Sequence, residues 1–226
     1  MSSVLHEERI AAMERATLDA VPPTQREERA GWLVAIDDGV VSRARSATPL
    51  SHTAALANSI DAVIACYAAA GQPPCFRLPD TPGLAGVCAQ LQARGFVDAS
   101  PTLVQVADVA AVVAAVAAGP ATPAKPAGDA TLRVDAEPDA AWCAVFLGDG
   151  VPADEAANRT AILRRARHAA YASVTAGGQT VATGMGSYSE GWASVHGMRT
   201  WPSHRGRGLA TLIVQRLAQE AHRRGM

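Results

Sequence analysis

The residues most suited to chemistry lie near the C-terminus, in the run Arg205, Gly206, Arg207, Gly208. Glycines lack a Cβ atom, so consecutive backbone N–H groups can converge on a bound anion. The two arginines add positive charge of the kind that pairs with phosphate oxygens. A helix that begins directly after such a loop adds its unpaired N–H groups and the positive end of its dipole. The sequence therefore predicts a phosphate-binding loop here.

The elements around this loop follow from apolar spacing. Residues 192–200 form a strand-like run, and residues 209–224 place leucines and isoleucine on one helical face. The P-loop pattern is absent, and a dinucleotide loop would need GxGxxG early in a βαβ unit. The simpler alternative is that the loop is a solvated helix N-terminus with no ligand.

This segment resembles the acyl-CoA loop of the GCN5-related N-acetyltransferases. It consists of a strand, Pro202, the run Arg205-Gly206-Arg207-Gly208-Leu209-Ala210 and a long helix. The family pattern is Gln/Arg-x-x-Gly-x-Gly/Ala, and Arg205, Gly208 and Ala210 occupy its defined positions. The preceding order of strand, two helices and three strands from residue 131 is similar to the same family. The resemblance implies an α/β (α+β) fold, with a mixed, largely antiparallel sheet flanked by helices.

The family resemblance also implies where acetyl-CoA binds as the acyl donor. The backbone of the loop and first helical turn would hold the pyrophosphate: Arg205, Gly206, Arg207, Gly208, Leu209, Ala210 and Thr211. The end of the preceding strand, at Met198, Arg199 and Thr200, would pair with the pantetheine arm. No metal is expected. The acceptor would be a primary amine of a small molecule or a protein.

Catalytic candidates are few. An amine attacks only when neutral, so a base is needed. His196 is the only group in the middle of strand 192–200 that titrates near neutrality, and Glu190 lies just before that strand. A histidine in a strand can equally be a packed or solvent-facing residue. We therefore carry His196 and Glu190 as alternative bases.

Composition excludes several classes of protein. The 226 residues are 49% hydrophobic and 18% charged, which is typical of a folded protein, and the formal charge is only −1. A nucleic-acid partner is disfavoured because no overall basic field exists. No apolar run reaches the roughly 20 residues of a membrane span, and residues 1–14 lack a signal-peptide pattern. The four cysteines have no CxxC spacing, which favours buried thiols in a reducing, cytoplasmic setting.

A Pro/Ala/Gly-rich segment at residues 118–130 predicts a linker between domains 1–117 and 131–226. In the first half we expect a hairpin of 32–36 with 40–47, helices at 54–70 and 83–94, and strands at 74–78 and 102–107. Helix, strand, helix and the run Gln90–Phe96 (QLQARGF) resemble the later half of the same family fold. Leu91 stands where the family often has its tyrosine acid. We therefore interpret this half as a degenerate, non-catalytic domain of the same type.

Two functions remain open. The leading one is an acetyl-CoA-dependent N-acetyltransferase, and the alternative is a non-catalytic acyl-CoA-binding or sensing module. The family fold continues past its long helix, whereas this sequence stops at Met226. We expect either a fragment or completion by another part or copy of the chain, so a homodimer is one arrangement left open.

Overall fold

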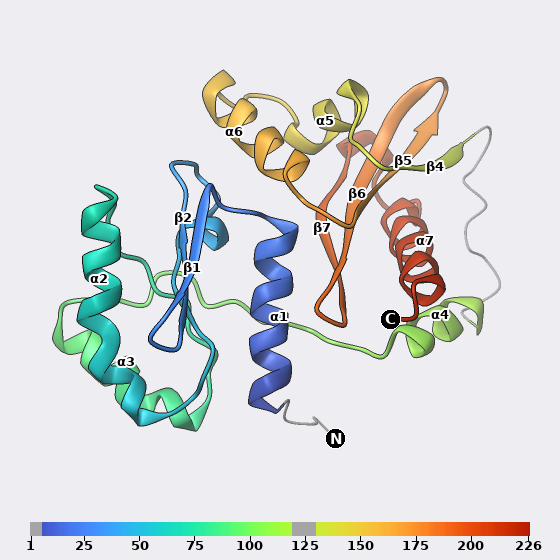
Figure 1. Ribbon diagram of the computed structural model, residues 1–226. Coiled ribbons are helices and arrows are strands. Elements are labelled where there is room, and N and C mark those ends of the chain that lie inside the picture. Colours follow the sequence, from blue (N-terminus) through green and yellow to red (C-terminus); the bar gives the residue numbers. More distant parts are fainter. Residues whose placement is uncertain (1–5, 119–129) are drawn as a thin grey trace. The chain divides into compact units, whose positions relative to one another are not determined.

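The computed structural model describes residues 6–118 and 130–226, and the chain divides into two compact units, Met1–Gln105 and Val106–Met226 (Figure 1). The boundary falls earlier than the predicted end of the first domain at residue 117. The reason is that helix α4 (Val109–Ala118) packs against helix α7 of the second unit, with Val109 against its apolar core. Most of the predicted linker, residues 119–129, lies outside the described residues.

The first unit is a small antiparallel sheet with helices on both faces. Its strands pair in the order β1 (Gln25–Arg29), β2 (Trp32–Ile36) and β3 (Thr48–Pro49). The α-helices are α1 (Glu7–Ala20), α2 (Ile60–Ala69) and α3 (Ala85–Ala93), and short 3-10 turns lie at Ser42–Arg45, Ala54–Ser59 and Pro82–Leu84. The helices expected at 54–70 and 83–94 are thus present, each entered through a 3-10 turn.

The predicted hairpin of 32–36 with 40–47 is wrong. Strand β2 turns back instead onto β1 through Ala30 and Gly31, both at positive φ (49° and 84°), the geometry of a tight two-residue hairpin. The Asp37 carboxylate accepts from the N–H groups of Thr24 and Gly39 at 2.9 Å each, so the Asp-Asp-Gly run caps a loop. Strand β1 escaped detection because its sequence, QREER, contains no apolar residue.

Two further strand predictions in the first half also differ from the structure. Of the strand expected at 74–78, only a single parallel bridge between Ala47 and Phe76 forms. Residues 102–107 form no strand, and the side chain of Leu103 is 85% exposed. Apolar runs this short carry no information about whether a pairing partner is within reach.

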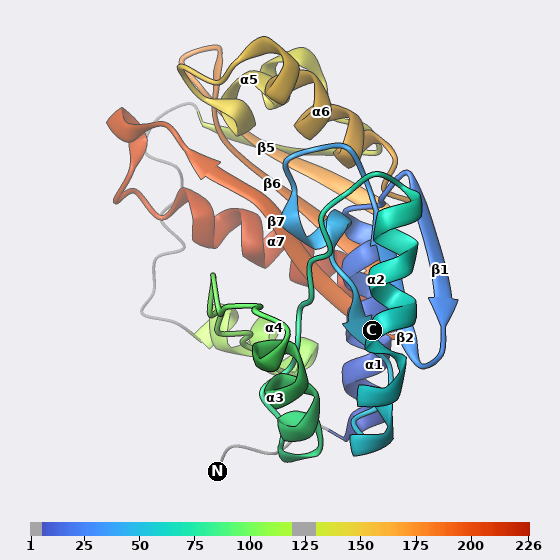
Figure 2. The same ribbon diagram turned by 90° about the vertical axis from the view of Figure 1, so that its left-hand side faces the viewer.

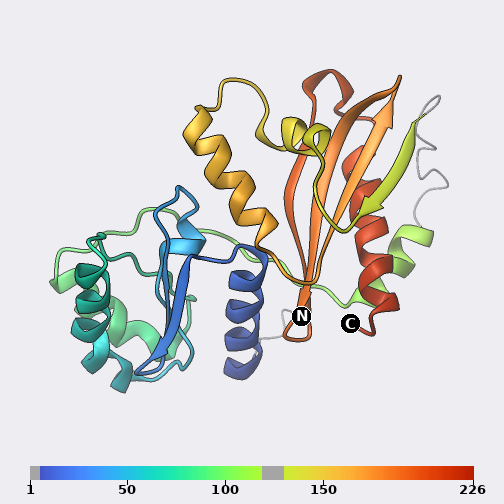
Figure 3. The same ribbon diagram turned by 45° about the horizontal axis from the view of Figure 1, so that its top comes forward.

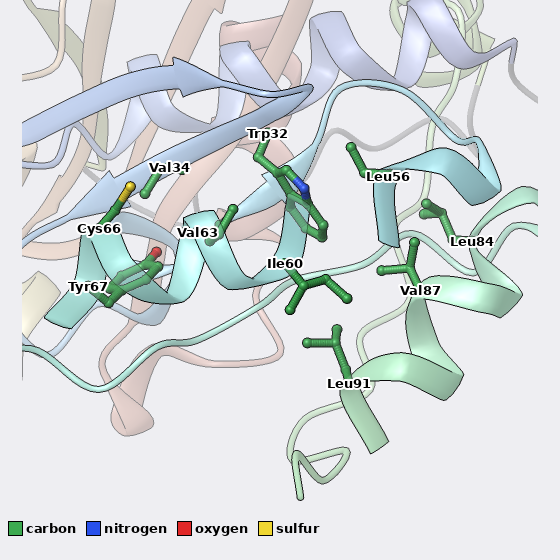
Figure 4. Close-up of a cluster of buried hydrophobic side chains, with 11 residues drawn as sticks. Trp32, Val34, Leu56, Ile60, Val63, Cys66, Tyr67, Leu84, Val87 and Leu91 are labelled. Carbon is green, nitrogen blue, oxygen red and sulfur yellow. The ribbon is translucent and has the colours of Figure 1, made fainter. Parts of the chain in front are cut away.

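The core of the first unit lies between the sheet and helices α2 and α3 (Figure 4). The indole of Trp32 packs edge-on to Phe76 with ring centroids 5.3 Å apart, and its Nε1–H donates to Ser59 Oγ at 2.8 Å. Tyr67 is fully buried and donates its hydroxyl to the Ala35 carbonyl at 2.9 Å. The opposite face of the sheet packs against α1 through a smaller cluster of Leu18, Leu33 and Ala35.

The second unit confirms the predicted strand order and the mixed, largely antiparallel fold. Its four-stranded antiparallel sheet runs β4 (Thr131–Asp135), β5 (Ala169–Ala176), β6 (Gln179–Ser189) and β7 (Trp192–Thr200). Between β4 and β5 lie α5 (Ala140–Leu147), whose first turn is capped by Asp139, and α6 (Ala153–Arg164). Helix α7 (Leu209–Arg223) follows β7.

The helices of the second unit cover different faces of its sheet (Figure 3). Leu209, Ile213, Leu217 and Ala221 of α7 are buried against one face, as the helical spacing predicted. On the other face, Trp142 of α5 packs edge-on to Tyr171 of β5, with ring centroids 5.4 Å apart. Helix α4 lies beside α7 (Figure 2). Across residues 6–118 and 130–226, no helix is long and apolar enough to cross a membrane.

Candidate functional site: the loop between β7 and α7

The candidate site begins where β7 ends. The Trp201 N–H donates to the Val181 carbonyl at 3.0 Å, which holds the first residue after the strand beside β6. One turn of 3-10 helix, Pro202–His204, then leads into the Arg/Gly loop. Gly206 and Gly208 both have positive φ, 73° and 74°, and Gly208 is the N-cap of α7. The loop conformation therefore depends on glycine at both positions.

The local geometry fits an anion. The first N–H groups of α7, including those of Leu209, Ala210 and Thr211, have no acceptor within the helix. Apart from Gly206 and its two chain neighbours, no atom of the residues that the structure describes lies within 4 Å of the place a Cβ of Gly206 would occupy, so a ligand can approach the backbone there. Leu209 is buried and anchors the turn, whereas residues 205–208 are exposed. A phosphate at this position would meet both N–H groups and the positive dipole end.

The two arginines of the loop also brace it. Arg205 donates from Nε to the Thr200 carbonyl at 3.2 Å, and Arg207 donates from Nη2 to the Ser203 carbonyl at 3.0 Å. Both side chains are exposed, and a guanidinium has five N–H donors. Each arginine therefore keeps further N–H donors besides the one that bonds to the backbone carbonyl. These side chains therefore fix the loop shape and bring two positive charges to it.

Strand β7 is the last strand of the four-stranded sheet, and one of its edges faces away from β6. Because Trp201 bonds to β6, alternation places the N–H and C=O of Thr200 on this outer edge. Met198 packs its side chain into the core beside α7, and Arg199 donates from Nη1 to the Leu147 carbonyl at 3.1 Å. Of the three residues expected to pair with pantetheine, Thr200 thus presents its backbone outward.

A β-bulge interrupts β7 beside this edge. The register passes from His196 opposite Met185 to Arg199 opposite Thr183, so β7 carries one residue more than β6 over this stretch. Gly197, at φ 58°, lies in the bulge, and a Cβ there would come within 3.1 Å of the Trp142 ring. Bulges re-aim neighbouring backbone and side chains. A glycine inside a strand pattern is the signal that could have predicted this one.

The structure separates the two candidate bases. His196 is half-buried in β7, and its Nε2 lies 2.8 Å from Ser194 Oγ. Glu190 is exposed in the β6–β7 turn, at φ 53°. Six residues of extended chain place the two on the order of 15 to 20 Å apart. His196 adjoins the bulge, whereas Glu190 lies at the opposite end of β7 from the loop.

Each of the three tyrosines in the sequence is buried and already donates its hydroxyl to a backbone carbonyl. Tyr67 donates to Ala35, Tyr171 donates to Leu163 at 2.6 Å, and Tyr188 donates to Leu217 at 3.2 Å. Burial raises the pKa of both Tyr171 and Tyr188 to about 12. These hydroxyls serve packing, so none is arranged as an acid at the loop.

A surface groove of about 570 Å³ lies between the end of α5 and the side of α6. Four of its six lining residues have small side chains, and the full set is Ala156, Ala157, Thr160 and Ala161 with Leu147 and Arg164. The Leu147 carbonyl in its wall is the one that accepts from Arg199. No periodic pattern in the sequence indicates this groove, because it depends on how two helices pack. Within the described ranges, no group of three or more His, Cys, Asp or Glu side chains could hold a metal ion.

Comparison with solved structures places this fold. A structure described as a GCN5-related N-acetyltransferase from Kribbella flavida matches with a TM-score of 0.61 and 17% sequence identity. The match covers 94% of this chain and 80% of that one. No curated protein matches the chain. The fold is therefore that of the GCN5-related N-acetyltransferases, as the loop motif predicted.

A family model identifies the chain more closely. The model described as "Probable histone acetyltransferase Rv0428c C-terminal" matches residues 8–226, which is nearly the whole sequence. The chain belongs to this acetyltransferase family.

Proposed function

We propose that this protein transfers an acetyl group from acetyl-CoA to a primary amine by direct transfer. The single observation that carries the proposal is the exposed Arg205–Gly208 loop, which follows the free edge of β7 and opens α7. Backbone N–H groups from Arg205 to Thr211 would hold the pyrophosphate, and Thr200 with its neighbours Met198 and Arg199 would align the pantetheine arm. Acetyl-CoA supplies the activated acyl group as a thioester.

The chain's own contribution is positioning and proton transfer. Fixing the donor along the β7 edge converts a bimolecular reaction into one between oriented groups. His196 is the better-placed base, since it lies beside the bulge, and its bond to Ser194 Oγ fixes one ring nitrogen. The amine nitrogen attacks the thioester carbonyl carbon and forms the N–C bond, and the base takes the proton that the nitrogen loses. The thiolate released as the C–S bond breaks takes up a proton from solvent.

The non-catalytic alternative, an acyl-CoA sensor, is favoured by one observation. Strand β7 contains no carboxylate, and the three tyrosine hydroxyls are committed to backbone carbonyls. Under that alternative the loop binds acetyl-CoA and no amine reacts. We also propose that the first unit is a degenerate, non-catalytic domain of the same fold: Leu91, in the position of the usual tyrosine, is buried in its core.

The test is to measure acetyl-CoA binding by calorimetry and thiol release with a panel of amines. The panel should include lysine peptides, because the family model is described as a probable histone acetyltransferase. Turnover above an amine-free control supports the enzyme, and binding without turnover supports the sensor. Absence of binding contradicts both.

The two candidate bases can then be compared with His196→Gln and Glu190→Gln. We expect the larger loss of turnover in His196→Gln, because a general base contributes typically 10²- to 10⁴-fold. The acidic limb of the pH–rate profile should change in that variant. A larger loss in Glu190→Gln would transfer the role to the glutamate.

A further inference from the structure

One face of β7 carries two polar side chains in direct contact. Ser194 and His196 are two residues apart on the strand, and Ser194 Oγ lies 2.8 Å from His196 Nε2. Residues two apart on a strand point to the same side of the sheet. Both side chains are half-buried, so each keeps some access to solvent. A hydroxyl and an imidazole at hydrogen-bond distance can transfer a proton between them.

The pairing of β7 with β6 shows which side of the sheet this pair occupies. His196 lies opposite Met185 in the register. A Cβ on Gly186, the neighbour of Met185, would come within 3.1 Å of Leu217 of α7. Because side chains alternate along a strand, Met185 and His196 point away from α7. The pair of Ser194 and His196 therefore lies on the face of the sheet that α5 contacts.

The pair also lies in line with the acetyl-CoA site proposed above. Under that proposal the pantetheine arm follows β7 from Thr200 to Met198, so the thioester at its end comes beside the bulge at Gly197. His196 adjoins the bulge. Ser194 is about 7 Å further along the strand, at two residues of extended chain. An amine that approaches the thioester from the side away from the pantetheine arm therefore meets Ser194 before His196.

The imidazole of His196 has one nitrogen placed to accept a proton from this direction. Nδ1 is buried, whereas Nε2 is the nitrogen that lies at Ser194 Oγ. A neutral imidazole with its hydrogen on Nδ1 accepts at Nε2, and the Ser194 hydroxyl is then the donor to it. Because the lone pair of Nε2 is directed at Ser194 Oγ, a proton from the amine reaches the imidazole by way of this hydroxyl.

We propose that Ser194 is a catalytic residue that relays the proton of the attacking amine to His196. The inference rests on the proposed acetyl transfer and deepens it. As the amine nitrogen bonds to the acetyl carbonyl carbon, its proton passes to Ser194 Oγ, and the hydroxyl proton of Ser194 passes to His196 Nε2. The C–S bond breaks, and the thiolate takes up a proton from solvent. After the amide leaves, the imidazolium returns its proton to solvent through the same hydroxyl.

A second serine supplies a matched control. Ser187 of β6 lies directly opposite Ser194 and on the same face of the sheet. It is 1% exposed, and its hydroxyl has no hydrogen-bond partner among residues 6–118 and 130–226. Burial keeps this hydroxyl from the amine. Ser187→Ala removes the same chemical group as Ser194→Ala, and we expect it to leave folding and turnover unchanged.

The first experiment determines which ring nitrogen of His196 carries the hydrogen. The full chain is isotope-labelled at its histidine nitrogens, and His196→Gln identifies the signals of His196. Long-range proton–nitrogen correlation spectra are recorded at about pH 8, above the ordinary imidazole pKa of about 6.5. We expect the Nδ1–H form, and a shift of the Nε2 resonance in Ser194→Ala. The Nε2–H form would make Ser194 the acceptor and overturn the relay.

The second experiment measures single-turnover acetyl transfer, so that product release does not mask the chemical step. The acceptor is the amine of the panel above that gives the highest turnover. Ser194→Ala should lower the rate about 10²-fold, the lower end of what a general base contributes, while the acetyl-CoA Kd stays unchanged. Ser194→Thr keeps the hydroxyl and should recover most of the rate. A loss in Ser187→Ala equal to that in Ser194→Ala would overturn the relay.

Mixtures of light and heavy water distinguish a relay from a serine that only orients His196. Two protons in motion make the transfer rate of the parent follow a curve against the deuterium fraction, whereas Ser194→Ala should give a straight line. The losses in Ser194→Ala and His196→Gln should fail to add in the double variant, because one proton path serves both residues. A straight line for the parent, or fully additive losses, would overturn the relay.

The relay and the acetyl transfer fail in different ways. Absence of amine turnover by the parent chain would refute acetyl transfer itself, and the relay with it. Turnover in the parent that Ser194→Ala leaves unchanged would refute the relay alone. Mass spectrometry after mixing with acetyl-CoA, without amine, tests a third possibility. An acetyl group on Ser194 would make the serine a nucleophile and also overturn the relay.

Discussion

A negative charge at Gly208 should weaken acetyl-CoA binding by an amount that can be worked out in advance. Gly208 caps α7 at φ 74°, a left-handed conformation that asparagine and aspartate tolerate better than other non-glycine residues. Gly208→Asp and Gly208→Asn therefore share the same backbone cost and nearly the same shape. They differ in one formal charge.

The magnitude follows from Coulomb's law. Two unit charges about 5 Å apart repel by about 0.8 kcal/mol in water and about 3 kcal/mol at an effective dielectric constant of about 20. Since residues 205–208 are exposed, we expect a value between these limits. That range corresponds to a Kd about 4-fold to about 150-fold weaker for Gly208→Asp than for Gly208→Asn.

Isothermal titration calorimetry with acetyl-CoA measures the difference, and thermal unfolding of both variants checks that the second unit is intact. The difference in acetyl-CoA affinity between the two variants should become smaller as the salt concentration rises, because exposed charges are screened. Equal affinity of the two variants at low salt would refute the assignment of the loop to the pyrophosphate.

Three further outcomes can be checked on the same protein. Gly184→Ala should destabilise the second unit by about 1 to 3 kcal/mol in denaturant unfolding, because a Cβ there would overlap side chains packed on the sheet. Gly86→Ala, within α3 and with open space around it, should instead stabilise by about 0.5 to 1 kcal/mol. Burial raises the pKa of Tyr171 and Tyr188 from 10.0 to about 12. The two neutral hydroxyls therefore contribute fully to the free energy of unfolding below pH 10, and this contribution is lost as pH rises towards 12. Replacing either tyrosine with phenylalanine should flatten that loss in unfolding measured from pH 9 to 12, and an unchanged slope would contradict the burial argument.

Local sequence was sufficient wherever an element could be recognised from its own residues. The spacing of Leu209, Ile213 and Leu217 predicted α7, because a helix buries positions three and four apart. The predicted order of strand, two helices and three strands from residue 131 is found in β4, α5, α6 and the β5–β6–β7 meander. The Arg205–Ala210 motif predicted the fold of the second unit through its resemblance to the family loop. Its glycines, Gly206 and Gly208, adopt positive φ angles of 73° and 74° that favour glycine.

Features that join distant segments were decided only by the tertiary structure. Strand β1 has no apolar residue and pairs because the turn at Ala30–Gly31 brings it to β2. Apolar residues 102–107 stay unpaired, and α4 joins the second unit by packing on α7. The groove beside α6 depends on how α5 and α6 pack, and the ion pair of Arg77 with Glu14 joins residues far apart in sequence. Sequence pattern records which face of an element is apolar, but the partner that covers that face is selected by packing of the whole chain.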